Sequence, residues 1–370
     1  MEDTLNAGIT WLDEPLQRRS DGPLAGRTLL VKDLIDTAGI RTTYGSKIYA
    51  DHVPEQNATV VERVLDAGAV VLGKANLPEF AWSVAGYNPW YGTVHNPAHP
   101  GRTTGGSSAG NAAAIAGGLC DLGIGTDTGC SIRLPAACCE IVGLKPAWSR
   151  IPIEGIFPVS PTLDTVGPMG KTVEDVALLW SALSQAEVPE PRLAGVSVGL
   201  LRQPPEVGDG RQTERSDIAE QWVSDLERLG ANVVDASIPN ARANTFAMFG
   251  HEALESHRAT FPNRAVEYAE TIGPKLRAAL ATSPEEVEAG YRALEEWRRY
   301  EPPVDLYLSP CYAVDLPAED AIESEIRLPL SSFMRWVNLT GWAGLAIGNM
   351  QLIAPRDETV LAAGLALERG

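Results

Sequence analysis

Two glycine-rich segments carry the serines with the clearest chemical potential in this sequence. The first, residues 105–110, contains Ser107 and Ser108, and the second, residues 125–135, contains Ser131. Glycine allows positive φ and brings backbone N–H groups close to a ligand, and successive N–H groups form a concavity that binds anions. A serine beside such a concavity supplies the nucleophile and the oxyanion hole of an acyl-transfer site. The pattern therefore indicates acyl transfer, for which a base is still needed.

Lys32 is the candidate base. It directly follows the apolar residues 27–31, which have the composition of a buried strand. Ligand sites in open α/β sheets lie at the carboxyl ends of strands, and burial there lowers the pKa of a lysine so that its neutral amine can accept a proton. None of the five histidines has a context that points to a serine. An ordinary strand-end lysine remains the alternative at this point.

The elements that must position these groups alternate between strand and helix. Apolar runs predict strands at residues 27–31, 69–72, 122–125, 141–144, 196–201, 232–236, 306–308, 343–347 and 350–353. Helical spacing and N-cap residues predict helices at 58–67, 76–82, 111–118, 172–183, 217–229, 241–260, 263–281, 284–300 and 357–368, with a loop over 86–104. Such alternation predicts an α/β fold with a largely parallel sheet covered by helices on both faces.

Composition narrows the classes of partner. The net charge of −18 and the pI near 4.7 argue against direct contact with nucleic acid or an anionic membrane. The first residues are acidic and lack an apolar core, and no apolar run approaches a membrane span, so we expect a cytoplasmic protein. The five cysteines form no CxxC pair, which favours reduced, buried thiols over a metal site.

Several blocks, in order, resemble the amidase signature family. They read LVKDLIDTAGIRTTYGS, GKANLPEFA, GGSSAGNAAAIAGG and GTDTGCSIRLPAA. The resemblance is dense from residue 26 to 183, thin over the middle and weak near the end. It implies one α/β/α amidase domain over residues 1–370, in which helices cover a large mixed, mostly parallel central sheet. The core of this domain is 26–183 plus 305–369, and residues 184–304 are a variable helical region.

The resemblance also assigns roles to three side chains. It implies that Ser131 is the acylated nucleophile, that Ser107 is the bridging serine, preceded in the family by a cis peptide bond, and that Lys32 is the base. The two serines stand 24 residues apart, the family's usual spacing. Chemically, a neutral lysine would draw a proton from Ser107, and Ser107 from Ser131, so that Ser131 can attack an amide carbonyl.

Further site residues follow from the same comparison. Backbone N–H groups of Thr128, Gly129, Cys130 and Ser131 are the expected oxyanion hole. Trp82 falls near the family's acyl pocket, and we name it with Ser108 as candidate substrate contacts. Cys130 stands where the family has glycine. If its φ is positive, the side chain is strained and Cys130→Gly should be harmless; if the thiol fills a pocket, glycine should loosen the oxyanion donors.

The function expected is hydrolysis of a small-molecule carboxamide, or of an ester or anilide, without metal or cofactor. A glutaminase subunit of a tRNA-dependent amidotransferase is one alternative, which the short N-terminal and middle regions disfavour. A non-catalytic binding member of the family, with Cys130 in its favour, is another, and a homodimer is an open alternative to a monomer. Residues 106–110 also match GxSxG, the elbow that would make Ser108 the nucleophile, but a polar loop precedes them instead of a strand.

Overall fold

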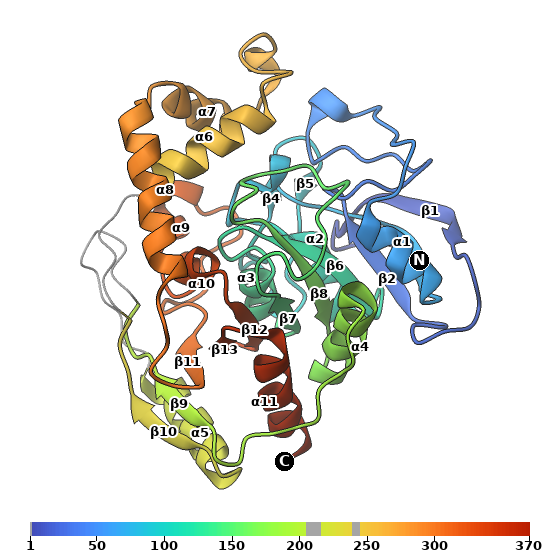
Figure 1. The fold of residues 1–370 in the computed structure, drawn as a ribbon. Helices are drawn as coiled ribbons and strands as arrows, with labels where there is room; N and C mark the ends of the chain where they lie inside the picture. The colour runs from blue at the N-terminus through green and yellow to red at the C-terminus, as the bar shows by residue number, and fades with distance from the viewer. Residues whose placement is uncertain (1, 205–215, 239–244) are drawn as a thin grey trace.

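The described part of this computed structural model, residues 2–204, 216–238 and 245–370, is built around one eleven-stranded sheet (Figure 1). The strand order is β1-β3-β2-β6-β8-β7-β12-β13-β11-β9-β10. The strands are β1 (Gly8–Leu16), β2 (Thr28–Lys32), β3 (Val70–Ala75), β6 (Leu122–Asp127), β7 (Val142–Lys145), β8 (Thr165–Gly170), β9 (Ser197–Leu200), β10 (Asn232–Asp235), β11 (Leu306–Pro310), β12 (Ala343–Ile347) and β13 (Met350–Ala354).

The sheet is mixed, as the sequence predicted. Strands β3, β2 and β6 are parallel neighbours, and so are β11, β9 and β10. Between these two groups, from β6 to β11, each neighbouring pair is antiparallel, and β1 is antiparallel to β3. A small separate hairpin pairs β4 (Tyr87–Asn88) with β5 (Gly92–Thr93).

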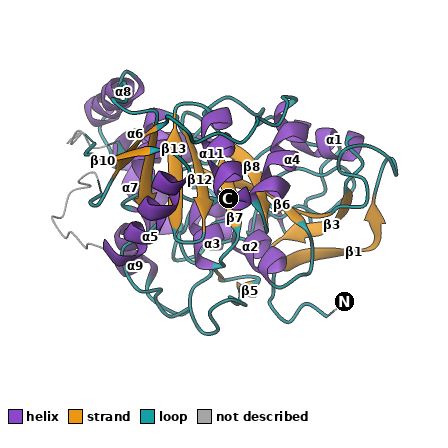
Figure 2. Ribbon diagram, turned by 90° about the horizontal axis from the view of Figure 1, so that it is seen from below, coloured by secondary structure: helices purple, strands orange, loops and turns teal. Residues whose placement is uncertain are grey.

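Helices cover both faces of the sheet and make the molecule a single α/β domain (Figure 2). One face packs against α1 (Thr59–Asp66), α4 (Val173–Ser184) and α11 (Asp357–Arg369), and the other against α2 (Ala109–Ala116) and α3 (Arg133–Cys138). The remaining helices are α5 (Ser216–Arg228), α6 (Phe246–Ser256), α7 (Gly273–Leu280), α8 (Pro284–Arg298), α9 (Glu323–Ser331) and α10 (Arg335–Thr340), with 3-10 turns η1 (Lys47–Tyr49), η2 (Glu79–Ala81) and η3 (Ala265–Glu267).

Strand β2 explains why an apolar run ends in a buried lysine. Leu29 and Val31 belong to the core beneath α1 and α4, whereas Leu30 belongs to the core beneath α2. A strand covered on both faces needs apolar residues at successive positions, which is the pattern that predicted it. Lys32 is its last residue and is fully buried at the carboxyl end of the strand.

Several predicted elements differ from the structure. The helix expected over 76–82 is only the short η2, because Phe80 and Ala81 have positive φ. The helix expected over 263–281 is divided into η3 and α7, which has Pro274 in its first turn. Of the helix expected over 241–260, residues 241–244 lie outside the described part, and α6 forms most of the rest. In that described part, no helix has the length and apolar composition to cross a bilayer.

Candidate active site

Lys32 lies among three hydroxyl groups. Its Nζ atom is 2.8 Å from Ser107 Oγ, 3.0 Å from Ser108 Oγ and 2.8 Å from Thr126 Oγ1. Burial lowers the pKa of Lys32 to about 7, although the nearby Asp127 carboxylate favours the charged form. A large fraction of the amine is therefore neutral near pH 7, where an exposed lysine would be fully protonated.

The hydrogen bonds around Ser108 show which serine can give a proton to this amine. The Ser108 hydroxyl donates to the Thr126 carbonyl oxygen over 3.3 Å, so it is an acceptor for Lys32. A neutral amine has two N–H bonds and one lone pair. If Ser108 and Thr126 accept the two N–H bonds, the lone pair is left for Ser107, and the 2.8 Å contact can carry a proton toward the lysine.

The two serine-bearing segments are tied together by their backbones. The Ser108 N–H donates to the Ser131 carbonyl oxygen over 3.1 Å, and the Gly106–Ser107 peptide bond is cis. Gly125 permits the approach, because a Cβ atom there would lie 2.7 Å from Ser108 Oγ. Ser107 is fully buried and Ser131 is 9% exposed, so Ser131 lies nearer to solvent.

A buried ion pair holds the turn that carries Ser131. Asp127 accepts hydrogen bonds from the N–H groups of Ile132 and Arg133 and pairs with the Arg133 guanidinium at 3.1 Å. Burial by itself raises the pKa of Asp127, but the charge of Arg133 and the hydrogen bonds from the Arg133 and Asn338 side chains hold that pKa below its usual range. Within the described residues, the N–H groups of 128–131 donate to no protein acceptor, which leaves them available to an oxyanion. Asp127 and Arg133 thus order the turn that carries Ser131.

Arg133→Met should lower the free energy of unfolding by about 3–5 kcal/mol, because it leaves the Asp127 carboxylate buried without its counter-ion. The matched control is Arg292→Met, which breaks an exposed pair with Glu288 and should change stability by about 0.5 kcal/mol or less. Urea unfolding of both variants checks this prediction. Equal, small losses for the two variants would contradict the structural role of the buried pair.

Cys130 does not have the strained backbone on which the harmless Cys130→Gly substitution was expected. Among the described residues, the non-glycine positions with positive φ do not include Cys130. Its side chain is buried in the core cluster that contains Cys311, Leu330 and Met334, and burial raises the pKa of its thiol to about 12. The structure therefore favours the other expectation, that the thiol fills space beneath the turn.

Cys130→Gly should accordingly destabilise the protein by about 1–2 kcal/mol, through the lost buried side chain and the added backbone freedom. Cys130→Ala keeps the Cβ atom and should lose less. Thermal unfolding of the two variants measures the difference. A gain in stability for Cys130→Gly would restore the strained-backbone interpretation.

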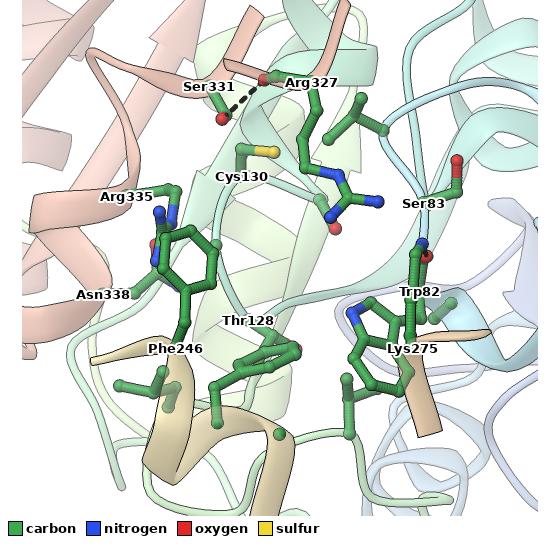
Figure 3. Close-up of a pocket in the computed structure, with 18 of the residues that line it drawn as sticks. Trp82, Ser83, Thr128, Cys130, Phe246, Lys275, Arg327, Ser331, Arg335 and Asn338 are labelled. Atoms are coloured by element: carbon green, nitrogen blue, oxygen red, sulfur yellow. Dashed lines mark hydrogen bonds between the residues drawn. The ribbon is translucent and has the colours of Figure 1, made fainter. Parts of the chain in front are cut away.

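A cavity of about 610 Å³ opens beside Ser131 (Figure 3). Residues 128–131 and 81–84 form one part of its wall. Residues from α6, α7, α8, α9 and α10, together with Val159, Leu163 and Thr282, form the rest. Trp82 lines the cavity, where the sequence placed a substrate contact. Ser108 is fully buried and is absent from the described lining, so the structure does not support the substrate contact expected of it; it contacts Lys32 instead.

Sequence reasoning missed the helical side of the cavity. Phe246, Lys275, Arg327, Arg335 and Asn338 lie there. None belongs to a motif with a recognisable chemical pattern. The family resemblance is weak near the end of the chain, and it assigned no role to Arg327 or Arg335.

Comparisons with known proteins identify the family and the fold of the chain. A family model described as "Amidase" matches residues 10–275. The A-type subunit of the glutamyl-tRNA(Gln) amidotransferase from Natronomonas pharaonis is 37% identical over 66% of this chain and 61% of the relative, and that from Symbiobacterium thermophilum is 42% identical over 59% and 48%. The chain spans about three fifths or less of the length of these curated relatives. The solved peptide amidase of Stenotrophomonas maltophilia has a TM-score of 0.81 and 26% identity, covering 100% of this chain and 90% of that one.

Proposed function

This chain belongs to the Amidase family, and from that premise we propose that it hydrolyses a carboxamide through an acyl-enzyme formed on Ser131. The observation that carries the proposal is the fully buried contact of 2.8 Å between Lys32 Nζ and Ser107 Oγ. A buried lysine with a pKa near 7 is a base only if a hydroxyl that leads to the substrate stands beside it. We assign that role to Ser107, because the next residue, Ser108, donates its N–H to the Ser131 carbonyl oxygen and so holds the two serine segments together.

The proposed reaction moves one proton in and out of the relay. Neutral Lys32 takes the proton of Ser107 as Ser107 takes that of Ser131, and Ser131 Oγ bonds to the amide carbon. The N–H groups of residues 128–131 stabilise the oxyanion. The C–N bond then breaks, Ser107 returns a proton to the leaving amine, and Lys32 reprotonates Ser107. Water, activated by the same relay, cleaves the ester and restores Ser131.

A second candidate differs in the fate of the ammonia. The relatives that are 37% and 42% identical are amidotransferase subunits, and this likeness supports a role in which the chain releases ammonia from glutamine inside a complex that acts on tRNA. The chemistry at Ser131 would be the same. The acidic net charge of −18 would then leave tRNA contact to the partner subunits.

The range of substrates and the need for partners separate the two candidates. The protein should be assayed with and without the remaining amidotransferase subunits of its host. Ammonia release reports on glutamine and on simple primary carboxamides, whereas release of the alcohol or of aniline reports on a matched ester and anilide. Turnover of non-glutamine amides without partners supports the independent amidase. Turnover confined to glutamine and dependent on partners supports the role in a complex. No turnover under any condition would favour a non-catalytic binding protein.

A further inference from the structure

The cavity carries more positive charge than the chain as a whole would suggest. Three cationic side chains line it, Lys275 from α7, Arg327 from α9 and Arg335 from α10, in a protein with a net charge of −18. Two carboxylates also line it, Glu323 and Glu286. A cluster of cations in a recess of an acidic protein attracts anions to that place.

The two carboxylates are already engaged. Glu323 accepts from Arg327 Nε over 2.8 Å and lies 3.8 Å from Lys275 Nζ, so one carboxylate serves two cations. Glu286 accepts from the backbone N–H of Ser283, in the capping box at the start of α8. Neither carboxylate forms an ion pair with Arg335.

Among the three lining cations, Arg335 is the one that has no anionic partner within the described residues. In the part of the chain that the structure describes, its guanidinium forms no hydrogen bond or ion pair with a protein group, and its Cζ atom lies 3.9 Å from the centre of the Phe246 ring. Burial lowers the pKa of Arg335 to about 10, with a contribution from the charge of Arg327, so the Arg335 guanidinium remains charged at neutral pH. A half-buried positive charge of this kind is stabilised by an anionic partner.

Arg335 is also close to the reacting position. Its Cγ atom would lie 3.8 Å from a Cβ atom on Gly129, which belongs to the oxyanion turn. Figure 3 shows Arg335 behind the Phe246 ring on one side of the cavity. Trp82 and Lys275 stand on the opposite side, across the space that a substrate would occupy.

We propose that Arg335 binds a carboxylate on the acyl portion of the substrate, so that the preferred substrates are carboxamides whose acyl chain ends in a carboxylate. The planar guanidinium offers paired N–H donors that match a carboxylate. Phe246 would hold the guanidinium plane in place through its ring face. This proposal rests on the proposed function, because Ser131 fixes where the amide carbonyl lies.

Binding to a Ser131→Ala protein tests the proposal without turnover. Titration calorimetry should compare succinamate, glutaramate and adipamate with butanamide, pentanamide and hexanamide, the uncharged amides of the same lengths. At least one carboxy amide should bind roughly 10–100-fold more tightly than its uncharged partner, the range of one hydrogen bond to a charged group. Arg335→Gln in the same background should remove the difference, and Arg335→Lys should keep part of it.

The control is Arg299→Gln, which removes one positive charge from the exposed pair with Glu295 on α8 and should leave the preference intact. Circular dichroism should show that the variants are folded. Equal affinity for charged and uncharged amides, no binding of any carboxy amide, or a preference that survives Arg335→Gln would each overturn the proposal. Fluorophosphonate labelling of the parent decides the proposed function separately. Labelled Ser131 with no anion preference would leave the amidase function standing and remove only the role of Arg335.

Discussion

Ser131→Ala is expected to lower kcat/KM on any amide that the parent hydrolyses by at least about 10⁴-fold, the scale seen when a catalytic serine is removed. The 128–131 turn carries two hydroxyl groups that line the cavity, and Thr128 donates its own to Asp164 over 2.6 Å, so Ser131 is the one that we propose as the nucleophile. The substitution deletes one oxygen atom at a position that is 9% exposed, so the thermal unfolding temperature should barely change. Steady-state ammonia release and thermal unfolding measure the two effects.

Ser108→Ala is the matched control. It removes a hydroxyl that is 3.0 Å from Lys32 Nζ but fully buried away from the cavity. We expect a loss of at most about 10²-fold, since Ser108 only orients the base. Retained activity in Ser131→Ala together with an inactive Ser108→Ala would instead favour the GxSxG interpretation, with Ser108 as the nucleophile.

Lys32→Met should lower kcat/KM by about 10³-fold or more, near the upper end of what general-base catalysis contributes. Methionine keeps the length and apolar stem of the side chain but provides no basic nitrogen. Lys74→Met is a useful control, because Lys74 is equally buried and sits on the neighbouring strand, but it contacts Ile35 O and Thr42 Oγ1 rather than a serine. Lys74→Met should lower the stability of the protein more than it lowers the kcat/KM of the folded enzyme.

The pH profile of the parent provides an independent test of the same base. With the pKa of Lys32 near 7, the protonated ammonium predominates below that pH and has no lone pair to accept the Ser107 proton. kcat/KM should therefore fall about tenfold per pH unit below about pH 7 and level off above it. A flat profile from pH 5.5 to 8.5, together with a nearly normal Lys32→Met variant, would rule out the relay.

The residues of the proposed site could be selected from the sequence because their signals are local. An apolar strand ending in Lys32, and glycine-rich turns around Ser107 and Ser131, are each visible within a few residues. The helical layers on both faces of the sheet followed from the alternation of strands and helices, and the mixed sheet followed from the family resemblance. The structure then placed the lysine and Ser107 in contact, which no single segment of the sequence could have shown.

What was missed depends on contacts between distant segments. Strand β8 contains Gly167, Pro168 and Gly170, a composition that suggests a turn. Gly167 nevertheless lies in the sheet, where a larger residue would not fit because its Cβ atom would lie 2.3 Å from the Leu144 carbonyl oxygen. No sequence motif indicated the role that we propose for Arg335, because that role arises only when α10 packs beside the 128–131 turn. The backbone of Cys130, likewise, could be judged only once its φ and its packing were known.

Peptide mapping of the parent after reaction with a fluorophosphonate is the sharpest test that Ser131 is the nucleophile, since it reports both a reactive serine and its position. We predict a single adduct, on Ser131, that is lost in Ser131→Ala and is formed slowly below pH 7 as Lys32 becomes protonated. An adduct on Ser108, or a protein that remains unlabelled while folded, would contradict it.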